Sequence, residues 1–397
     1  MASQPPLPVV EAQARLFAMA QRASSESVPL AAAAGRWLAE PLVALRSQPA
    51  SDVSAMDGYA LRFADMPGPW SVVGESAAGR FFHGVLGAGE ATRIFTGASM
   101  PEGADTVLIQ EEASCDHKVL MLAGKGPAKK GANVRRKALD FSRGQTLISA
   151  GERLTPARLA LAATAGHGRL LVNRRLRVAL LATGDELIDP ADASSNPSAL
   201  PEGNCAMVAA MLADLPVDIE PLGIVADTLD ALSRVLSATR ADIIVTTGGA
   251  SVGAYDFVRP ALIAAGGSIN FWRIALRPGK PMLAGRLGDA LVLGLPGNPV
   301  SAFVTATLFL RPLIATMAGA AHPMPTTFQA VLGETLPRND HRQDYLRAIL
   351  DDGKITVASI QDSSMLAPLA NANCLVIRTP HAPEAHLGDT VEIIPIA

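Results

Sequence analysis

Cysteine is scarce in this sequence, with three residues in a chain of 397. Cys115, Cys205 and Cys374 lie far apart, and no two of them form a CxxC pair. This spacing argues against a disulfide framework and against a zinc site built from thiolates. It fits a reducing compartment, so we expect a cytoplasmic protein.

Charge and long apolar runs are also limited. Charged residues make up 18% of the chain and the formal net charge is -3, so no global field draws in nucleic acid or an anionic membrane. No stretch approaches the roughly 18 unbroken apolar residues of a membrane helix. The first residues lack the basic and apolar regions of an export signal. We therefore expect neither nucleic acid nor a membrane as a partner.

Turns and apolar segments are abundant, with 34 Gly, 29 Pro and 49% hydrophobic residues. A chain of this length suggests two to four domains. Changes in composition predict a multidomain α/β plus β protein. We expect a discontinuous helical domain over residues 1–48 and 145–174, a β-rich insert over 49–144, an α/β domain over 175–325 and a C-terminal β domain over 326–397. Ala-rich helices are expected at 7–22 and 29–45.

The α/β region alternates apolar strands with helices, which predicts a mainly parallel sheet covered on both faces. Ligands of such sheets bind beyond the carboxyl ends of the strands. Three strands there are followed by the glycine-containing loops ATGDE, TTGGASVGAYD and LGLPGNPVS. Glycine lets backbone N–H groups approach a ligand, and a helix N-terminus behind them favours phosphate or another oxyanion. One such loop is commonly only a connection, but three at one edge favour an anion site.

Acids gather at the same predicted edge of the sheet, at Asp185, Glu186, Asp227 and Asp256. A carboxylate repels an anionic ligand unless a cation lies between them, which points to a hydrated Mg²⁺. Helix capping by Asp227 and Asp256 is an equally good explanation on local grounds.

A basic turn follows in FWRIALRPGKPM, where Arg273, Arg277 and Lys280 flank a Pro-Gly pair. Three cations at a tight turn suit an oxyanion, although a lone basic turn is more often only solvated. The run KKGANVRRKALD has the same two explanations. It lacks interleaved aromatic residues, which argues against nucleic acid.

Seven segments carry a resemblance to a known family: SAMDGYAL, RIFTGASMPEGADTVLIQEE, GANVRRKALDF, ATGDEL, TTGGASVGAYDFV, RPGKP and LGLPGNPVSA. In this order they resemble the molybdopterin molybdenumtransferase family, which includes MoeA and the gephyrin E domain. The resemblance covers nearly the whole chain. It implies a discontinuous helical domain, an elongated β-rich insert, a three-layer α/β molybdopterin-binding domain and a C-terminal β-barrel, assembled as a homodimer. In such dimers the active cleft lies between the α/β domain of one chain and the insert of the other.

The resemblance also implies a reaction, in which molybdate and adenylylated molybdopterin give molybdenum cofactor and AMP with the help of Mg²⁺. The adenylyltransferase that makes the substrate is an expected partner. The implied catalytic residues are Asp57, Thr96, Asp140 and Glu186, and the implied Mg²⁺ ligands are Asp227 and Asp256. The implied pterin-binding residues are Gly248, Gly249, Ser251, Gly253, Arg273, Pro296, Gly297, Asn298 and Pro299. Molybdate is assigned to Arg277, Lys280, Ser301, Arg347 and Ser363.

Two other functions stay open at this point. A molybdopterin adenylyltransferase shares the α/β domain and its loops but needs neither the SAMDGYA insert nor the last β domain. A pterin-binding scaffold would keep the fold without turnover, yet it has no need for acids beside an anion site, here Asp57, Asp140, Glu186, Asp227 and Asp256. From the residues alone, Asp57 and Gly58 also suit a turn, and Asp140 suits a loop.

Overall fold

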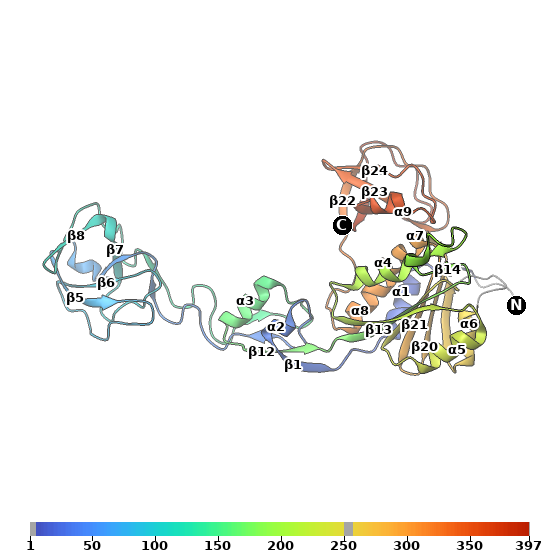
Figure 1. Ribbon diagram of the computed structural model, residues 1–397. Helices are drawn as coiled ribbons and strands as arrows, with labels where there is room; N and C mark the ends of the chain where they lie inside the picture. The colour runs from blue at the N-terminus through green and yellow to red at the C-terminus, as the bar shows by residue number, and fades with distance from the viewer. Residues whose placement is uncertain (1–4, 250–256, 397) are drawn as a thin grey trace.

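A computed structural model describes residues 5–249 and 257–396. The molecule is elongated: a β-rich arm lies at one end, a small region with two short helices lies in the middle, and the α/β domain with the C-terminal β domain lies at the other end (Figure 1). The fold class predicted from the resemblance is confirmed.

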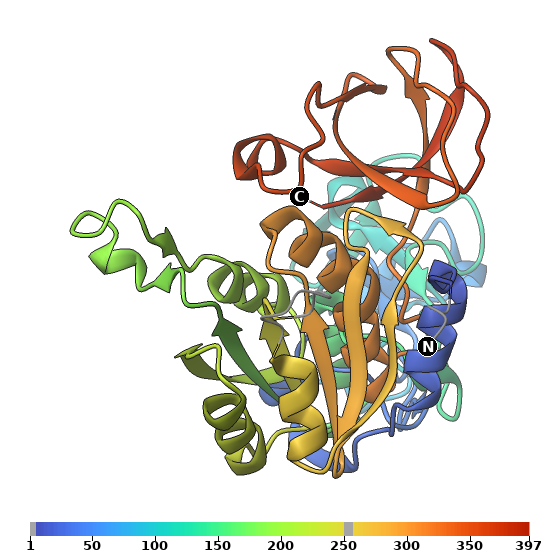
Figure 2. The same cartoon turned by 90° about the vertical axis from the view of Figure 1, so that its right-hand side faces the viewer.

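The α/β domain contains a six-stranded sheet in the order β16-β13-β17-β21-β20-β18. The first three pairings are parallel and the last two are antiparallel, so the sheet is mainly parallel as predicted. The bounds are β13 (Leu176–Thr183), β16 (Val217–Val225), β17 (Ile243–Thr247), β18 (Ser268–Arg273), β20 (Pro281–Leu287) and β21 (Ala290–Leu295). A short parallel pair, β14 (Leu187–Ile188) with β15 (Leu200–Pro201), projects beside the sheet (Figure 2).

Helices cover both faces of this sheet and form two separate apolar cores. On one face lie α5 (Leu229–Ala238) and α6 (Val258–Ala264). On the other lie α1 (Val9–Ala18), α4 (Asn204–Leu212) and a continuous helical run of α7 (Pro299–Thr305), the π-helical turn η4 (Ala306–Leu310) and α8 (Arg311–Met317). This run is apolar enough to cross a membrane, but 83% of it is buried inside the protein, and it therefore packs as a core helix.

The arm is a curled six-stranded sheet in the order β7-β4-β6-β5-β9-β8. Its strands are β4 (Gly58–Leu61), β5 (Trp70–Ser76), β6 (Glu90–Ile94), β7 (Thr106–Ile109), β8 (Ala113–Asp116) and β9 (Val119–Leu122). The pair β3 (Val53–Ser54) with β10 (Val134–Arg135) continues it toward the middle of the molecule. The two buried clusters of the arm are small, so it presents much of its surface to solvent.

The middle region differs from the predicted helical domain in two respects. Helix α1 packs on the α/β core, because Val9, Ala12 and Leu16 lie on one apolar stripe that contacts α8 and β18. The expected helix at 29–45 shrinks to α2 (Leu30–Ala33), since Gly35 takes a left-handed φ of 73° that ends it. Helix α3 (Pro156–Thr164) forms as predicted, with the Thr155 hydroxyl accepting from the Arg158 amide at 3.3 Å. The remaining strands here are β1 (Ser25–Pro29), β2 (Leu42–Val43), β11 (Thr146–Ile148) and β12 (Arg169–Asn173).

The C-terminal domain is a closed barrel of five strands that lies above the carboxyl ends of the α/β strands (Figure 2). Its strands are β22 (Phe328–Leu332), β23 (Gln343–Asp351), β24 (Lys354–Val357), β25 (Cys374–Arg378) and β26 (Thr390–Pro395), and α9 (Leu366–Ala370) follows one of its loops. The α/β domain adds β19 (Leu276–Arg277) to the edge of β23. This pairing fixes the barrel to the sheet.

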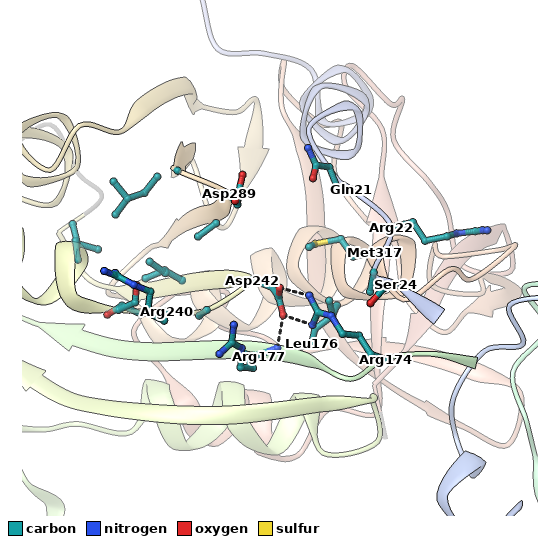
Figure 3. Close-up of a pocket in the computed structure, with 18 of the residues that line it drawn as sticks. Gln21, Arg22, Ser24, Arg174, Leu176, Arg177, Arg240, Asp242, Asp289 and Met317 are labelled. Carbon is teal, nitrogen blue, oxygen red and sulfur yellow. Dashed lines mark hydrogen bonds and ion pairs between the residues drawn. The ribbon is translucent and has the colours of Figure 1, made fainter. Parts of the chain in front are cut away.

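An ion pair holds the joint between the middle region and the α/β domain (Figure 3). Arg174 follows β12, and its guanidinium donates to both oxygens of Asp242 at 2.8 and 2.7 Å. The Arg177 amide donates to the same carboxylate at 2.8 Å. Burial raises the pKa of Asp242, but these hydrogen bonds outweigh it and leave the pKa below its ordinary value.

We expect Asp242→Asn to lower the free energy of unfolding by roughly 2 kcal/mol at neutral pH, because it leaves Arg174 partly buried without its carboxylate. A lowered pKa contributes stability above the unfolded value of about 3.9, and this contribution is lost as pH falls through the folded value. The stability difference between wild type and variant should therefore shrink below pH 4 in urea unfolding. The exposed pair Arg175–Asp218 supplies the control, since Asp218→Asn should change stability by less than about 0.5 kcal/mol. Equal effects of the two variants would refute this role of Asp242.

Candidate functional site

The predicted loops meet at a cavity of about 620 Å³ beyond the carboxyl ends of β13, β17 and β21. The chain leaves β13 toward β16 on one side and returns to β17 on the other, so the cavity lies at a topological switch point. The predicted residues that line it are Glu186, Asp227, Gly248, Gly249, Pro296, Gly297, Asn298, Pro299 and Ser301. Ser251, Gly253 and Asp256 lie outside the described residues.

Glycine is required where two of the loops approach each other. Gly248 has a φ of 88°, and a Cβ there would lie 2.3 Å from the Thr183 carbonyl oxygen. A Cβ on Gly297 would lie 3.6 Å from the Gly248 Cα, an ordinary van der Waals distance, so the LGLPGNPVS loop lies against the TTGGASVGAYD loop without requiring glycine at 297. Backbone rather than side chains therefore forms much of this wall, as anion recognition by N–H groups requires.

Three acids come together on one side of the cavity. Asp227 accepts a hydrogen bond from the Thr183 hydroxyl at 3.2 Å, and its own amide donates to Asp185 at 3.3 Å. Burial, followed by the charges of Asp185 and Glu186, raises the pKa of Asp227 despite the Thr183 hydrogen bond. Such an arrangement favours a cation, because a positive charge would relieve both the burial and the repulsion.

The basic residues are arranged differently from the expectation. Arg277 donates through Nε to Asp344 at 2.9 Å, through Nη1 to Asp340 at 3.2 Å and through Nη2 to Asn339 at 3.0 Å. All three of its nitrogens are thus engaged by the C-terminal domain. Lys280 is exposed and lies next to Pro281, which lines the cavity. Arg273 lies on β18, opposite Pro281.

The C-terminal domain contributes a wall of the cavity next to Ser363, which the resemblance had implied for molybdate. Ser364 and Leu366 line the cavity, although they follow Asn298 by more than sixty residues. Ser363 accepts a hydrogen bond from the Asn298 side chain at 2.9 Å. Asn204 holds the same loop from the other side by donating to the Gly297 carbonyl at 2.7 Å. The DSSM segment carries no local signal for this contact, because only the tertiary fold brings it to the loop.

The remaining predicted catalytic residues lie on or near the arm. Thr96 donates to Asp57 Oδ1 through its amide at 2.7 Å and its hydroxyl at 2.8 Å. These two hydrogen bonds and the nearby Arg93 lower the pKa of Asp57, so it carries a negative charge at neutral pH. Asp140 is exposed in the segment that returns from the arm, where its amide donates to the Gln48 carbonyl at 3.0 Å. The arm lies at the opposite end of the molecule from the α/β domain, which forms most of the cavity, so one chain does not bring the predicted set together (Figure 1).

A larger cavity, of about 760 Å³, lies at the other end of the strands, where β13, β17 and β21 begin (Figure 3). Two of its arginines have local roles: Arg174 binds Asp242, and Arg240 donates at 2.8 Å to the Ser237 carbonyl near the end of α5. Helices α5 and α6 both end at this edge, and helix C-termini disfavour anions. Size alone therefore does not identify the functional site. We assign the functional site to the smaller cavity, where the predicted loops meet.

The fold and this cavity define an α/β ligand-binding protein whose site lies at a switch point under a β-barrel. Three family models match the chain: the MoeA N-terminal region (domain I and II) at residues 7–166, a probable molybdopterin binding domain at 179–316, and the MoeA C-terminal region (domain IV) at 329–396. The chain therefore belongs to the MoeA family of molybdopterin molybdenumtransferases. This confirms the resemblance noted in the sequence and places the chain among enzymes.

Relatives and solved structures agree with this assignment. The chain is 34% identical over 381 residues to the molybdopterin molybdenumtransferase of Haemophilus influenzae, covering 94% of each chain. It is 32% identical over 404 residues to that of Bacillus subtilis, covering 98% of this chain and 94% of the relative. The crystal structure of a Pyrococcus molybdopterin biosynthesis MoeA protein superposes with a TM-score of 0.81 at 26% identity, covering 98% of this chain and 99% of that one.

We expect Gly248→Ala to destabilise the protein more than a left-handed φ alone would explain. Gly288 provides the matched control, since it has a φ of 57° and no described atom lies within 4 Å of the position that an added methyl group would take. Gly288→Ala should cost about 1–2 kcal/mol from backbone strain, and Gly248→Ala at least about 2 kcal/mol more because its Cβ meets a backbone carbonyl. Urea unfolding of both variants measures the difference. Equal losses would mean that the loop moves away from Thr183 without any loss of stability.

Proposed function

We propose that the chain transfers molybdenum from molybdate to adenylylated molybdopterin and releases AMP. The observation that carries this proposal is the cavity at the switch point, where the loops of Gly248 and Gly297 present backbone to an anionic ligand and Asp227 lies at the side. A pterin pyrophosphate needs both features: backbone N–H groups that bind the phosphates, and an acid that can hold a cation to neutralise their charge. Family membership supplies the reaction class.

Mg²⁺ fits this site as an ion carried in part by the substrate. Within the described residues no group of three or more potential ligands is preformed, but Asp227 has a raised pKa beside Asp185 and Glu186. Mg²⁺ commonly binds through one or two carboxylates together with substrate phosphates and water. Asp227 is the proposed ligand on the described chain, with Asp256 as its partner. The ion would neutralise the charge of the pyrophosphate. Glu186, the proposed catalytic acid, lines the same cavity.

Molybdate is proposed to bind near the start of α7, close to Ser301 and Lys280. The N-terminus of a helix and an ammonium group both attract an oxyanion. Arg277 is kept in this proposal because it lies in the same basic turn as Lys280. Its nitrogens already donate to Asp340, Asp344 and Asn339. Arg273 stands on the strand beside Pro281 and is proposed to face the pterin.

A homodimer is proposed to complete the site. Asp57, Thr96 and Asp140 lie on or beside the arm, away from the cavity of their own chain. In a two-fold dimer the arm of one chain can reach the cavity of the other, and the same contact then forms twice. A cytoplasmic location and delivery of the substrate by an adenylyltransferase belong to the same proposal.

The first experiment is to mix the protein with adenylylated molybdopterin and Mg²⁺ and to follow AMP release with and without molybdate. We expect AMP release that depends on molybdate, together with active cofactor. Transfer of AMP from ATP onto the pterin would instead identify an adenylyltransferase. Tight pterin binding without AMP release would identify a scaffold.

Two inactive variants test whether the dimer shares its sites. Asp57→Asn and Asp227→Asn should each abolish AMP release without lowering the melting temperature, because both side chains are only partly buried and neither change opens the core. Mixed by co-refolding or co-expression in equal amounts, they should regain roughly a quarter of the wild-type rate, since half of the dimers would carry one intact site of two. No recovery in confirmed heterodimers would mean that each chain supplies its own site.

A further inference from the structure

Arg93, on β6 of the arm, is half-buried and lies against two aromatic rings. In the pairing of β6 with β4, Arg93 stands opposite Tyr59. The Cζ atom of its guanidinium lies 5.0 Å from the centroid of the Tyr59 ring and 5.1 Å from that of the Phe95 ring. A guanidinium is attracted to the face of an aromatic ring. The two rings therefore limit the positions that the Arg93 side chain can take.

The same guanidinium forms hydrogen bonds with two neighbouring segments. Nη1 donates to the Gly58 carbonyl at 3.3 Å, and Nη2 donates to the side-chain oxygen of Gln110 at 2.7 Å. Gln110 begins the short 3-10 helix η2 (Gln110–Glu112), and its amide donates to the Asp57 carbonyl at 3.0 Å. Arg93 thus links β6 to the residue that follows Asp57 and to the residue that binds the Asp57 backbone.

These contacts lie beside both members of the Asp57–Thr96 pair. Asp57 directly precedes β4, and Thr96 follows β6 after Phe95, whose ring Arg93 contacts. Thr96 donates to the Asp57 carboxylate through both its amide and its hydroxyl. A Cβ on Gly58 would lie 2.0 Å from the Leu108 carbonyl oxygen, so β4 lies tightly against β7. The base on which Asp57 stands is therefore firm, and Arg93 joins that base to the strand that carries Thr96.

Arg93 is also the charged side chain whose field reaches Asp57 within the described chain. The hydrogen bonds from Thr96 lower the pKa of Asp57 first, and the charge of Arg93 lowers it further against the effect of burial. Burial raises the pKa of Tyr59, so its hydroxyl stays neutral beside the guanidinium at pH 7. The described residues that line the α/β cavity include no arginine or lysine. An arm that carries Asp57 together with Arg93 would therefore bring a carboxylate to that cavity without adding net negative charge.

We infer that Arg93 is a positioning residue for the proposed reaction: it joins the start of β4 to the end of β6, so that Asp57 and Thr96 are held together beside a positive charge. This inference rests on the proposed function of Asp57 and Thr96 in a site that two chains share. Arg93 acts through these two residues and does not itself touch the substrate. Arginine suits the task because its planar fork reaches two oxygens in different directions, whereas an ammonium group is a compact point charge.

The test compares Arg93→Gln with Arg62→Gln in the full-length protein. Arg62 is a matched control, because it follows the other end of β4 and forms an ion pair with Asp65 at 3.7 Å. Amide hydrogen exchange is measured for peptides covering 94–100 and 107–113, which contain the Thr96 and Gln110 amides. The rate of AMP release in the presence of molybdate is measured for each protein.

Arg93→Gln should speed exchange in both peptides and lower the rate of AMP release about tenfold or more, the loss expected for a charge-assisted hydrogen bond. Arg93→Lys keeps a charge near the rings and should recover part of that rate. Arg62→Gln should change neither exchange nor rate. Unchanged exchange in Arg93→Gln would overturn the inference, because a lower rate alone would mark Arg93 as a direct substrate ligand. A lysine variant as slow as the glutamine variant would overturn the role of the charge.

Mixed dimers supply a readout that a general loss of stability would not produce. Arg93 and Asp57 lie on the same arm, so Asp227→Asn, which contributes an intact arm, should rescue Arg93→Gln, whereas Asp57→Asn should not. In equal mixtures we expect roughly a quarter of the wild-type rate with Asp227→Asn and about a twentieth with Asp57→Asn. Equal rates in the two mixtures would show that Arg93 does not act on the arm's half of the site.

Gln110→Ala keeps the inference testable if Arg93→Gln does not fold. It removes the oxygen that accepts from Arg93 but keeps the amide that binds the Asp57 carbonyl, and it should speed exchange in the same two peptides to a smaller extent. Unchanged exchange in this variant counts against the inference. If the wild type shows no molybdate-dependent AMP release, or if Asp57→Asn and Asp227→Asn do not complement each other, the proposed function fails. The exchange data then decide alone whether Arg93 positions Asp57 and Thr96.

Discussion

The close approach of backbone at the end of β17 is the constraint on which the rest of the site depends. Gly248 lies directly beneath the Thr183 carbonyl, and Gly297 lies against Gly248. A Cβ does not fit at Gly248, and the ends of β13, β17 and β21 converge on the same cavity. The parallel sheet sets the spacing of the strands, and the glycines allow their loops to turn inward where a ligand can meet N–H groups.

Arginine side chains join the parts of this molecule rather than line its cavity. Arg174 fastens the middle region to the α/β domain through Asp242, and Arg277 fastens the α/β domain to the barrel through Asp344. Both use the forked geometry of the guanidinium to bind more than one oxygen. Among the described residues that line the cavity there is no arginine or lysine, so backbone dipoles supply positive potential there.

Local patterns predicted the strands and loops of the α/β domain well, because continuous apolar runs followed by glycine leave few alternatives. They placed α1 in the middle region, whereas it packs on the α/β domain. An apolar stripe predicts that a helix packs against a partner, but it does not identify the partner. The partners of Arg277 were equally hidden, because it is a basic residue near a turn in the sequence and the acids that it binds are known only from the tertiary fold. The arm residues Asp57 and Thr96 were found through resemblance, although their hydrogen bonds do set them apart from an ordinary turn.

The separation of the acids also has a physical logic under the proposed function. A carboxylate held permanently beside a pyrophosphate would weaken its binding, and the pKa of Asp227 is already raised, first by burial and then by the charges of Asp185 and Glu186. Asp57, by contrast, is stabilised in its charged form by Thr96. In the proposed homodimer, the arm would bring this charge to the cavity of the second chain, where Glu186 and Asp227 already lie.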